Sequence, residues 1–445
     1  MDIGEFAETG LKVGAKLKLD DMELLCTSTS MLMARIENRE VTLRLEENLF
    51  CAGVRFIKSG RMGYVPLAEP SAALLETGIR AALAKAGPAP FPDFTLIERQ
   101  RDDLEARDQK VAALLSQPAK VRDFAQDIVS RSWATGRVET LEGHVAIQVE
   151  DRLLTTLHSR VPVRMERTLF STSTEVDSKD FDIITGRNLP DLEAAADLGA
   201  RLALDIPKTS STPEAEGVKG RSVPVTIHPV MMDEILRRLV AEHFYASTVQ
   251  EGMSKYRLGD RVGSELVTLW DDATNPFGFH TFPTDDEGSP SQRTLVIENG
   301  ILRTFLYDRA SAAREGRPST GSGRRRPVLI EEEHEAPIRC TCADLVLKPG
   351  TTPLREMIAG IGSGVLAKYL LGFHTSNRTT GDFANTLYMG RVIRNGELAA
   401  LPEPGRWSIK GNALELMRNI TAVSRETMKV GASDLPWVRT ELAVA

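Results

Sequence analysis

The 445-residue sequence has few cysteines, no long apolar run and no excess of basic residues. Four cysteines are too few for disulfide bonds to stabilise a chain of this length, so we expect no disulfide framework and a reducing compartment. No stretch approaches the roughly 20 consecutive apolar residues that a membrane-spanning helix needs. The opening residues, MDIGEFAETG, lack the basic and apolar regions of a secretory signal. These absences predict a cytoplasmic protein that does not act at a membrane.

The charge balance argues against nucleic acid as a partner. The chain carries 55 lysines and arginines against 62 aspartates and glutamates, a formal net charge of −7. Binding to duplex nucleic acid needs a basic face that neutralises phosphates. The arginine triplet at 324–326 is followed closely by three glutamates at 331–333. We interpret this segment as a solvated, self-compensating surface.

Length and composition predict a soluble globular protein of two or three domains, with 42% hydrophobic and 26% charged residues. Residues 207–221, PKTSSTPEAEGVKGR, are polar and rich in Ser, Thr, Pro and Gly, which is typical of a linker. Residues 1–206 before it mix helical and strand-like patterns, and the Gly/Pro-rich stretch near 87–103 could divide them into two lobes. Residues 222–445 form the second region. We therefore expect an α+β fold.

Hydrophobic periodicity predicts the main elements. In the first region we expect helices near 2–17, 70–86, 102–135 (broken near 117) and 190–204. Strand-like runs lie at 22–27, 31–37, 41–45, 50–57 and 62–65, followed by a hairpin at 137–150 and 152–158 and a strand at 161–174. In the second region we expect a strand at 223–227, an amphipathic helix at 229–246 and a hairpin around Asn395-Gly396.

The most informative stretch runs from 258 to 327. Its centre is the acidic loop Asp285-Asp286-Glu287-Gly288-Ser289-Pro290, followed by an apolar strand and the turn Glu298-Asn299-Gly300. Further on come Tyr307-Asp308, Ala312-Ala313-Arg314 and the segment Ser319-Thr320-Gly321-Ser322-Gly323-Arg324-Arg325. Loops of this kind, held by a sheet, commonly carry function.

These ordered blocks resemble the TldD/PmbA family, whose TldD and TldE (PmbA) subunits pair as a metallopeptidase. The resemblance continues weakly to the C-terminus and covers roughly half of the chain. It implies an α+β N-terminal region, with helices packed on mixed sheets, and a sheet-rich C-terminal domain. It also implies that the acidic loop and the 320–324 segment belong to a chamber that handles peptides. The candidate chamber residues are Asp285, Asp286, Glu287, Gly288, Thr320, Gly321, Gly323 and Arg324.

The zinc-binding motif of the TldD-type subunit is missing. That subunit carries H-E-x-x-x-H on the helix before the central run, where two imidazoles hold the ion and an open position holds water. Counting back from the block Glu265-Leu266-Val267-Thr268 puts the two histidine positions near Ile235 and Val240. The family's cysteine ligand near the C-terminus has no counterpart in the tail KVGASDLPWVRTELAVA. The chain therefore resembles the PmbA/TldE side of the family, with no catalytic residue, metal ligand or cofactor of its own.

Other residues allow a functional and a structural interpretation. His243 could bind a metal, but a single histidine at the polar end of a helix is commonly a partly exposed surface group. His334, Cys340 and Cys342 could form a soft metal site, or the cysteines could be buried thiols. The acidic residues could bind a hard cation, although their spacing fits no calcium loop. For His243 and the two cysteines we favour the structural interpretation. For the acidic residues we favour a structural or substrate-lining role. These residues are Asp271, Asp272, Asp285, Asp286 and Glu287.

Three functional hypotheses follow. The first is a TldE/PmbA-like subunit that pairs with a zinc-bearing TldD-like partner and completes a chamber for extended or unfolded peptides, which strand addition could hold. The second is a stand-alone metal-dependent hydrolase with an unrecognised site. The third is a regulatory protein that acts on a topoisomerase, which only the family's older name, modulator of DNA gyrase, suggests.

Overall fold

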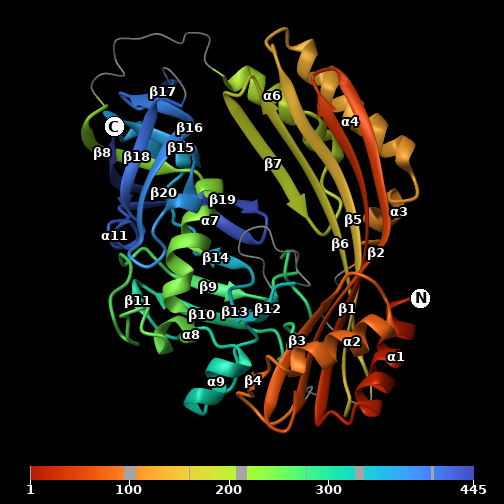
Figure 1. Ribbon diagram of the computed structural model, residues 1–445. Coiled ribbons are helices and arrows are strands. Elements are labelled where there is room, and N and C mark those ends of the chain that lie inside the picture. The colour runs from red at the N-terminus through yellow and green to blue at the C-terminus, as the bar shows by residue number, and fades with distance from the viewer. Residues whose placement is uncertain are drawn as a thin grey trace.

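The computed structural model describes residues 2–94, 107–159, 161–206, 218–276, 278–325, 335–401 and 405–445. Two large sheets organise these residues, and Figure 1 shows them side by side, the first on the right and the second on the left. The expected linker at 207–221 falls mostly outside the described residues, which resume at Val218. No helix within the described ranges is both long and apolar enough to cross a membrane.

The first sheet has seven antiparallel strands in the order β4-β3-β2-β1-β5-β6-β7. Its strands are β1 Asp21–Glu37, β2 Glu40–Lys58, β3 Arg61–Leu67, β4 Gly87–Pro88, β5 Leu141–Thr156, β6 Val163–Val176 and β7 Asp180–Gly186. Two groups of helices cover it: α1 Ile3–Lys16 and α2 Ala72–Leu83 at one end, and α3 Gln109–Leu114, α4 Pro118–Ala134, α5 Leu192–Ala196 and α6 Leu198–Asp205 at the other (Figure 1). Each group packs on its own hydrophobic core.

Strands β1 and β2 correct the prediction of four short strands. Each is one long strand, and β1 pairs along nearly its whole length with both β2 and β5. Leu24 belongs to the core under α1 and α2, whereas Leu32 belongs to the core under α4. The residues between them, 27–31, are only half-buried, and a bulge lies between Thr29 and Met31. The apolar pattern stops there because the strand passes from one helix layer to the next.

Strand β5 likewise replaces the predicted hairpin at 137–158. Asp151, which separates the two predicted strands, and Arg152, which begins the second, both continue the ladder with β1 and β6. Arg152 is 5% exposed because it faces the second half of the chain, where it meets an acidic partner. The polar residue Arg152 inside this strand therefore marks a contact between the two halves.

The second sheet has eleven strands. The strand order along its main path is β11-β10-β9-β14-β20-β18-β16-β15-β8. In addition, β17 pairs with β16 and β19 pairs with β20. Because β8 also pairs with β20, the strands β8, β15, β16, β18 and β20 form a closed ring. The bounds are β8 Arg221–Ile227, β9 Leu269–Asp272, β10 Arg293–Glu298, β11 Ile301–Leu302, β14 Leu345–Leu347, β15 Ser363–Leu371, β16 Asp382–Arg394, β17 Glu397–Ala400, β18 Trp407–Asn412, β19 Ala422–Val430 and β20 Ser433–Val444. A separate two-stranded sheet pairs β12 Gly323–Arg325 with β13 Ile338–Cys340.

The predicted amphipathic helix at 229–246 is present but is not a uniform α-helix. It begins as α7 Pro229–Ile235, continues as a π-helical turn, η2 Leu236–Val240, and then as a 3₁₀ turn, η3 Ala241–Phe244. Its apolar side packs into the core of the second sheet. π-turns inside helices are rare and frequently lie at functional sites. The remaining helices are α8 Ala246–Gln250, α9 Arg309–Glu315, α10 Leu354–Ala359, η4 Phe373–Thr375 and α11 Ala413–Arg418.

Two regions join the halves of the molecule. At the tip of the first sheet, Asp180 accepts hydrogen bonds from Lys368 at 2.8 Å and from Arg391. At the other end, Ala310 of α9 packs against Phe91 and Phe94, and Figure 1 shows α9 beside β4. The acidic loop lies between these regions, as described next.

Candidate functional site

The acidic loop at 285–288 runs along one edge of the small β12–β13 sheet. Asp285 accepts hydrogen bonds from the backbone N–H groups of Glu287, Ser289 and Gly323, at 3.0, 2.9 and 2.8 Å. Asp286 accepts one from the backbone of Arg325 at 2.7 Å, and its own N–H donates to the carbonyl of Gly323 at 3.0 Å. The loop therefore occupies the place of a third strand beside β12. Within the 320–324 segment, the backbone N–H of Gly323 thus donates to a carboxylate of the same chain.

Close packing explains the glycines of this segment. A Cβ atom on Gly323 would lie 2.2 Å from Oε2 of Glu287. Gly321 has a φ of +69°, and a Cβ there would lie 2.5 Å from the carbonyl oxygen of Pro290. Gly288 has a φ of +78°, in the left-handed region that favours glycine. Thr320 donates its backbone N–H to the carbonyl of Tyr307 at 3.0 Å, and its hydroxyl accepts the N–H of Tyr307 at 2.7 Å.

Charged side chains of the loop attach it to the first sheet. Glu287 accepts a hydrogen bond from Nη1 of Arg55 at 2.7 Å, and Arg55 also donates to Glu23 at 2.9 and 2.6 Å. Arg152 lies 3.2 Å from Asp286. All of these side chains are at most 7% exposed. Buried pairs of this kind fix the two halves in one relative position, because separating them would leave an unpaired charge in the protein interior.

The pKa values of the two aspartates of the loop are shifted in opposite directions. Burial raises the pKa of Asp285, and the neighbouring charge of Glu287 raises it further. Burial also acts to raise the pKa of Asp286, but Arg152 and Arg324 outweigh it and lower that pKa.

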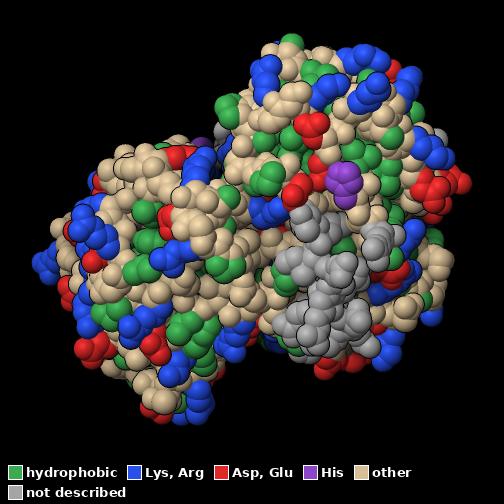
Figure 2. Space-filling view, turned by 90° about the horizontal axis from the view of Figure 1, so that it is seen from below, with side chains coloured by type: hydrophobic (Ala, Val, Ile, Leu, Met, Phe, Trp, Pro, Cys, Tyr) green, Lys and Arg blue, Asp and Glu red, His purple; other side chains and the backbone are tan. Residues whose placement is uncertain are grey.

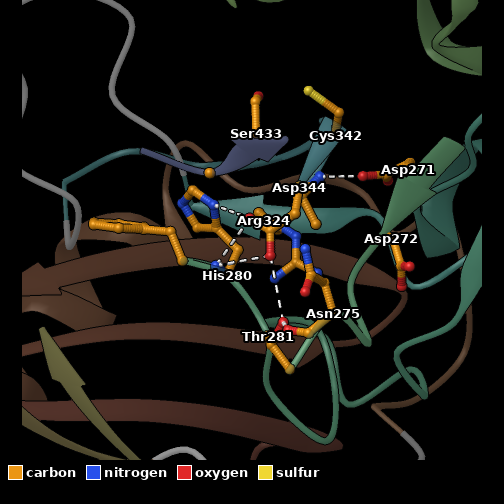
Figure 3. A network of polar contacts seen from close by, with 12 residues as sticks. Asp271, Asp272, Asn275, His280, Thr281, Arg324, Cys342, Asp344 and Ser433 are labelled. Atoms are coloured by element: carbon orange, nitrogen blue, oxygen red, sulfur yellow. Dashed lines mark hydrogen bonds and ion pairs between the residues drawn. The ribbon is translucent and has the colours of Figure 1, made fainter. Parts of the chain in front are cut away.

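A second buried network lies near Arg324, and Figure 3 shows it. Asp344 accepts hydrogen bonds from the backbone N–H of His280 at 3.1 Å and from the hydroxyl of Thr281 at 3.3 Å. Asp271 accepts the N–H of Ala343 at 2.7 Å. Burial raises the pKa of Asp344 and raises that of Asp271 to about 7. These carboxyls are engaged with the backbone and fix loops at the sheet edge.

The eight residues that the sequence singled out thus lie together around β12. Seven of them, all except the half-buried Thr320, are buried. They contact each other, neighbouring segments of the second half and the first sheet. Glu287 also lines a cavity of about 380 Å³. Whether any of them contacts a substrate stays a prediction.

A cavity of about 780 Å³ lies over the polar side of α7 and η2. The helix contributes Asp233, Glu234, Arg237, Arg238 and Glu242. Other walls come from the start of α9, from β13 and from the loop before β16, and include Tyr245, Asp308, Arg314, Ile338, Arg339, Cys340, Thr341 and Arg378. Sequence reasoning missed this site because it treated the helix as a core element. The charged residues that interrupt the apolar pattern of this helix are the sequence feature that could have revealed the site.

The cavity offers a second register for the missing metal motif. Ile235 and Val240, the positions obtained by counting along the sequence, are 0% and 1% exposed and lie in the core. The cavity-facing residues with the spacing of H-E-x-x-x-H are Asp233, Glu234 and Arg238. Neither register places histidines at the two positions.

These residues do not fit a zinc ion. Asp233 accepts a hydrogen bond from Arg237 at 2.8 Å, and Glu234 accepts one from Arg238. Arg237 also donates to the carbonyl of Ala343 at 3.0 Å. Arginine stays protonated in proteins and offers no lone pair to a metal. In the part of the chain that the structure describes, no group of three or more His, Cys, Asp or Glu side chains is placed to hold a metal ion.

The remaining metal candidates have other surroundings. His243 is 4% exposed, so its interpretation as a partly exposed surface group is wrong; its Nε2 atom lies 3.1 Å from the carbonyl of Arg378, and burial lowers its pKa. Cys340 and Cys342 are 4% and 1% exposed, which confirms the expectation of buried thiols. Burial raises the pKa of Cys340. His334 lies outside the described residues.

One face of the molecule shows no dominance of one charge. Figure 2 views the molecule from below, and on this face Lys and Arg side chains are interspersed with Asp, Glu and apolar side chains. Such a surface lacks the continuous basic stripe that binding to a nucleic acid backbone requires.

Comparison with known proteins places these features in a family. The model of the family described as PmbA/TldA metallopeptidase C-terminal domain matches residues 219–445. An uncharacterized protein of Methanocaldococcus jannaschii is 24% identical over 94% of this chain and 94% of its own length. A protein named metalloprotease from the same organism is 31% identical over 45% of this chain and 43% of its own length. Another, from Methanothermobacter thermautotrophicus, is 26% identical over 84% of this chain and 81% of its own length.

Two solved structures share the fold across the chain. TldE from Thermococcus kodakarensis superposes with a TM-score of 0.79 at 20% identity and covers 98% of this chain and 100% of its own. A protein from Thermotoga maritima, described as a proposed modulator of a DNA gyrase, has the same TM-score at 21% identity and full coverage of both chains. At this identity the likeness concerns the fold, which confirms the expected α+β architecture with a sheet-rich second half.

Proposed function

Because the chain belongs to the PmbA/TldD metallopeptidase family, we propose that it is a TldE-like subunit without a metal centre, which completes the substrate chamber of a zinc-bearing TldD-like partner. The pair cleaves extended or unfolded peptides in the cytoplasm. The zinc and its activated water belong to the partner, and this chain supplies a wall of the chamber. Neither nucleic acid nor a membrane takes part.

One observation carries this proposal. At the motif spacing, the cavity presents Asp233 and Arg238 where two histidines would be needed. Both are held in ion pairs on the same helix, with Arg237 and Glu234 respectively. Restoring a metal site would require breaking both pairs, and an arginine would still stand at one ligand position. The cavity itself remains open and polar, as expected for a surface that receives a peptide but does not cleave it.

The acidic loop has a supporting role in this proposal. Asp285 and Asp286 accept hydrogen bonds from backbone N–H groups of β12. Strand β12 pairs with β13, and β13 lines the cavity. Glu287 ties the same unit to Arg55 of the first sheet. The loop thus keeps the chamber wall at a fixed position relative to both halves of the molecule.

Purified protein tests the proposal directly. The chain and a TldD-like protein are prepared separately, their zinc content is measured by elemental mass spectrometry, and cleavage of an unstructured peptide is followed for each alone and for the mixture. We expect almost no zinc in this chain and chelator-sensitive cleavage that increases when the two are mixed. Chelator-sensitive cleavage by this chain alone would establish instead a stand-alone hydrolase. Retention of a topoisomerase in place of a TldD-like protein in a pull-down would favour the regulatory hypothesis.

A further inference from the structure

Arg187 is a buried arginine without a carboxylate partner. It directly follows β7 and is 1% exposed. Its Nη2 atom donates a hydrogen bond to the backbone carbonyl of Thr281, in the second half of the chain. Within the described part of the chain, its Nε and Nη1 atoms have no hydrogen-bond partner, and Arg187 forms no ion pair. The charge of this guanidinium group is therefore unmatched in the protein interior.

Three buried guanidinium groups surround the ring of Phe282. The Cζ atoms of Arg152, Arg167 and Arg187 lie 5.0, 5.3 and 5.2 Å from the centre of that ring. The three arginines belong to the first half of the molecule, on β5, on β6 and just after β7, whereas Phe282 belongs to the second half. The attraction between a cation and an aromatic face is favourable, but it does not replace a counter-charge for a buried ion.

Arg187 differs in this respect from the two arginines beside it. Arg167 donates a hydrogen bond to Glu150, and Glu150 also lies 3.4 Å from Arg152. Arg152 in turn lies 3.2 Å from Asp286. Neither of these two carboxylates pairs with Arg187. Of the three guanidinium groups around the aromatic ring, that of Arg187 is therefore the one whose charge no carboxylate of the described residues matches.

The pKa of Arg187 is shifted in the direction that this imbalance requires. Burial lowers that pKa, and the neighbouring charge of Arg167 lowers it further, to about 9. Asp344 and Glu150 act in the opposite direction but do not compensate for these two effects. Arginine nevertheless stays protonated in proteins. A positive charge that is buried without a partner is unfavourable, and an anion that binds next to it removes this cost.

We propose that Arg187, with Arg167 beside it, binds a small monovalent inorganic anion, such as chloride, at the junction between the two halves. The donors are Nε and Nη1 of Arg187 and Nε of Arg167, which also lacks a partner among the described residues. The anion must be compact, because a phosphate ester or a peptide carboxylate would bring a large group to a site where Arg187 is 1% exposed. Arg167 and Arg187 also donate to the carbonyls of Phe279 and Thr281, so the anion would help to fix this loop of the second half. The inference concerns the folded chain by itself and does not depend on the proposed function.

Thermal unfolding of the full chain tests the proposal. Sodium chloride replaces sodium gluconate at constant ionic strength, because gluconate is too large for a buried site, and circular dichroism gives the melting temperature. A ligand specific for the folded state, at about a hundred times its Kd, raises the melting temperature of a domain of 150–250 residues by about 5–11 °C. We expect a rise of this kind for the parent chain as chloride increases. Arg187→Met removes the charge and keeps an apolar side chain, so its melting temperature should not depend on chloride. Arg107→Met is the control, since Arg107 is 32% exposed and pairs with Glu166 at 2.9 Å, and it should retain the dependence.

A second measurement uses the parent chain alone and therefore does not depend on the folding of a variant. In crystals grown in sodium bromide, the anomalous scattering of bromide should give a peak in contact with the guanidinium group of Arg187. The same chloride dependence in the parent and in Arg187→Met would overturn the proposal, because it would show a general salt effect. A parent chain with equal melting temperatures in chloride and gluconate, and with no bromide peak at Arg187, would also overturn it and would leave water as the partner of these donors.

Discussion

Glu287 should be among the side chains that most stabilise the junction between the two halves. It is 1% exposed and accepts hydrogen bonds from Arg55 at 2.7 Å and from the backbone N–H of Arg309 at 2.7 Å. Glu287→Ala leaves the buried guanidinium of Arg55 with Glu23 as its remaining carboxylate, and it leaves the N–H of Arg309 without this acceptor. Removing one member of a buried ion pair typically costs about 3–5 kcal/mol.

That magnitude corresponds to a measurable change in melting temperature. For domains of 150–250 residues, 1 kcal/mol shifts the midpoint by about 2–4 °C, so we expect a decrease of roughly 6–20 °C by circular dichroism. Glu287→Gln, which keeps the shape and one acceptor, should fall between the parent and the alanine variant. The transition that shifts should be the one in which the two halves separate, if two are resolved.

An exposed glutamate in the same region provides the control. Glu298 pairs with Arg303 at 3.0 Å, but the two side chains are 43% and 50% exposed. Solvent screening reduces such a pair to about 0–1 kcal/mol, so Glu298→Ala should shift the midpoint by no more than a few degrees. Equal shifts for Glu287→Ala and Glu298→Ala would refute the reasoning that buried ion pairs hold the halves together.

Three further predictions concern Asp271, the cavity-facing helix and Gly323. The raised pKa of Asp271, about 7, means that the folded state retains a proton that the unfolded state releases, so this carboxyl lowers stability as pH rises from about 4 to 7. Asp271→Asn should therefore gain about 2–3 kcal/mol over the parent in urea unfolding at pH 8 relative to pH 5, and an equal difference at both pH values would contradict this. Asp233→His combined with Arg238→His generates H-E-x-x-x-H on the cavity face and should raise zinc content toward about one ion per chain, whereas histidines at the buried positions 235 and 240 should destabilise the fold without binding zinc. Gly323→Ala should destabilise by about 1–3 kcal/mol in urea unfolding, because its Cβ would lie 2.2 Å from Glu287, while Gly362→Ala, with open space around it, should change little.

Local pattern was sufficient for many elements. The helix at 3–16 follows an apolar period and begins at Asp2, which accepts the N–H groups of Gly4 and Glu5. The hairpin at Asn395-Gly396 has positive φ at both residues, as that pair of residues predicts. Propensity and turn chemistry act over a few residues, so they can be read without the rest of the chain.

Strand length was less predictable. The break in the apolar pattern at 27–31 predicted the end of a strand. Strand β1 nevertheless continues through these residues, because both neighbouring strands pair with it there. Asp151, which separated the two predicted strands of a hairpin, likewise lies inside one continuous strand. A polar residue inside a strand is tolerated when its partner comes from a distant segment, as Asp286 does for Arg152, and no local pattern reveals that partner.

By itself, the sequence determined the family-specific blocks, the α+β composition, and the lack of paired histidines on the helix at 229–246. It could not decide which side of that helix faces a cavity, because the π-turn shifts the apolar face within one turn. Nor could it decide that the acidic loop lies along the edge of β12. Both depend on contacts between residues far apart in the chain, such as Glu287 with Arg55, and those contacts exist only once the two sheets have come together.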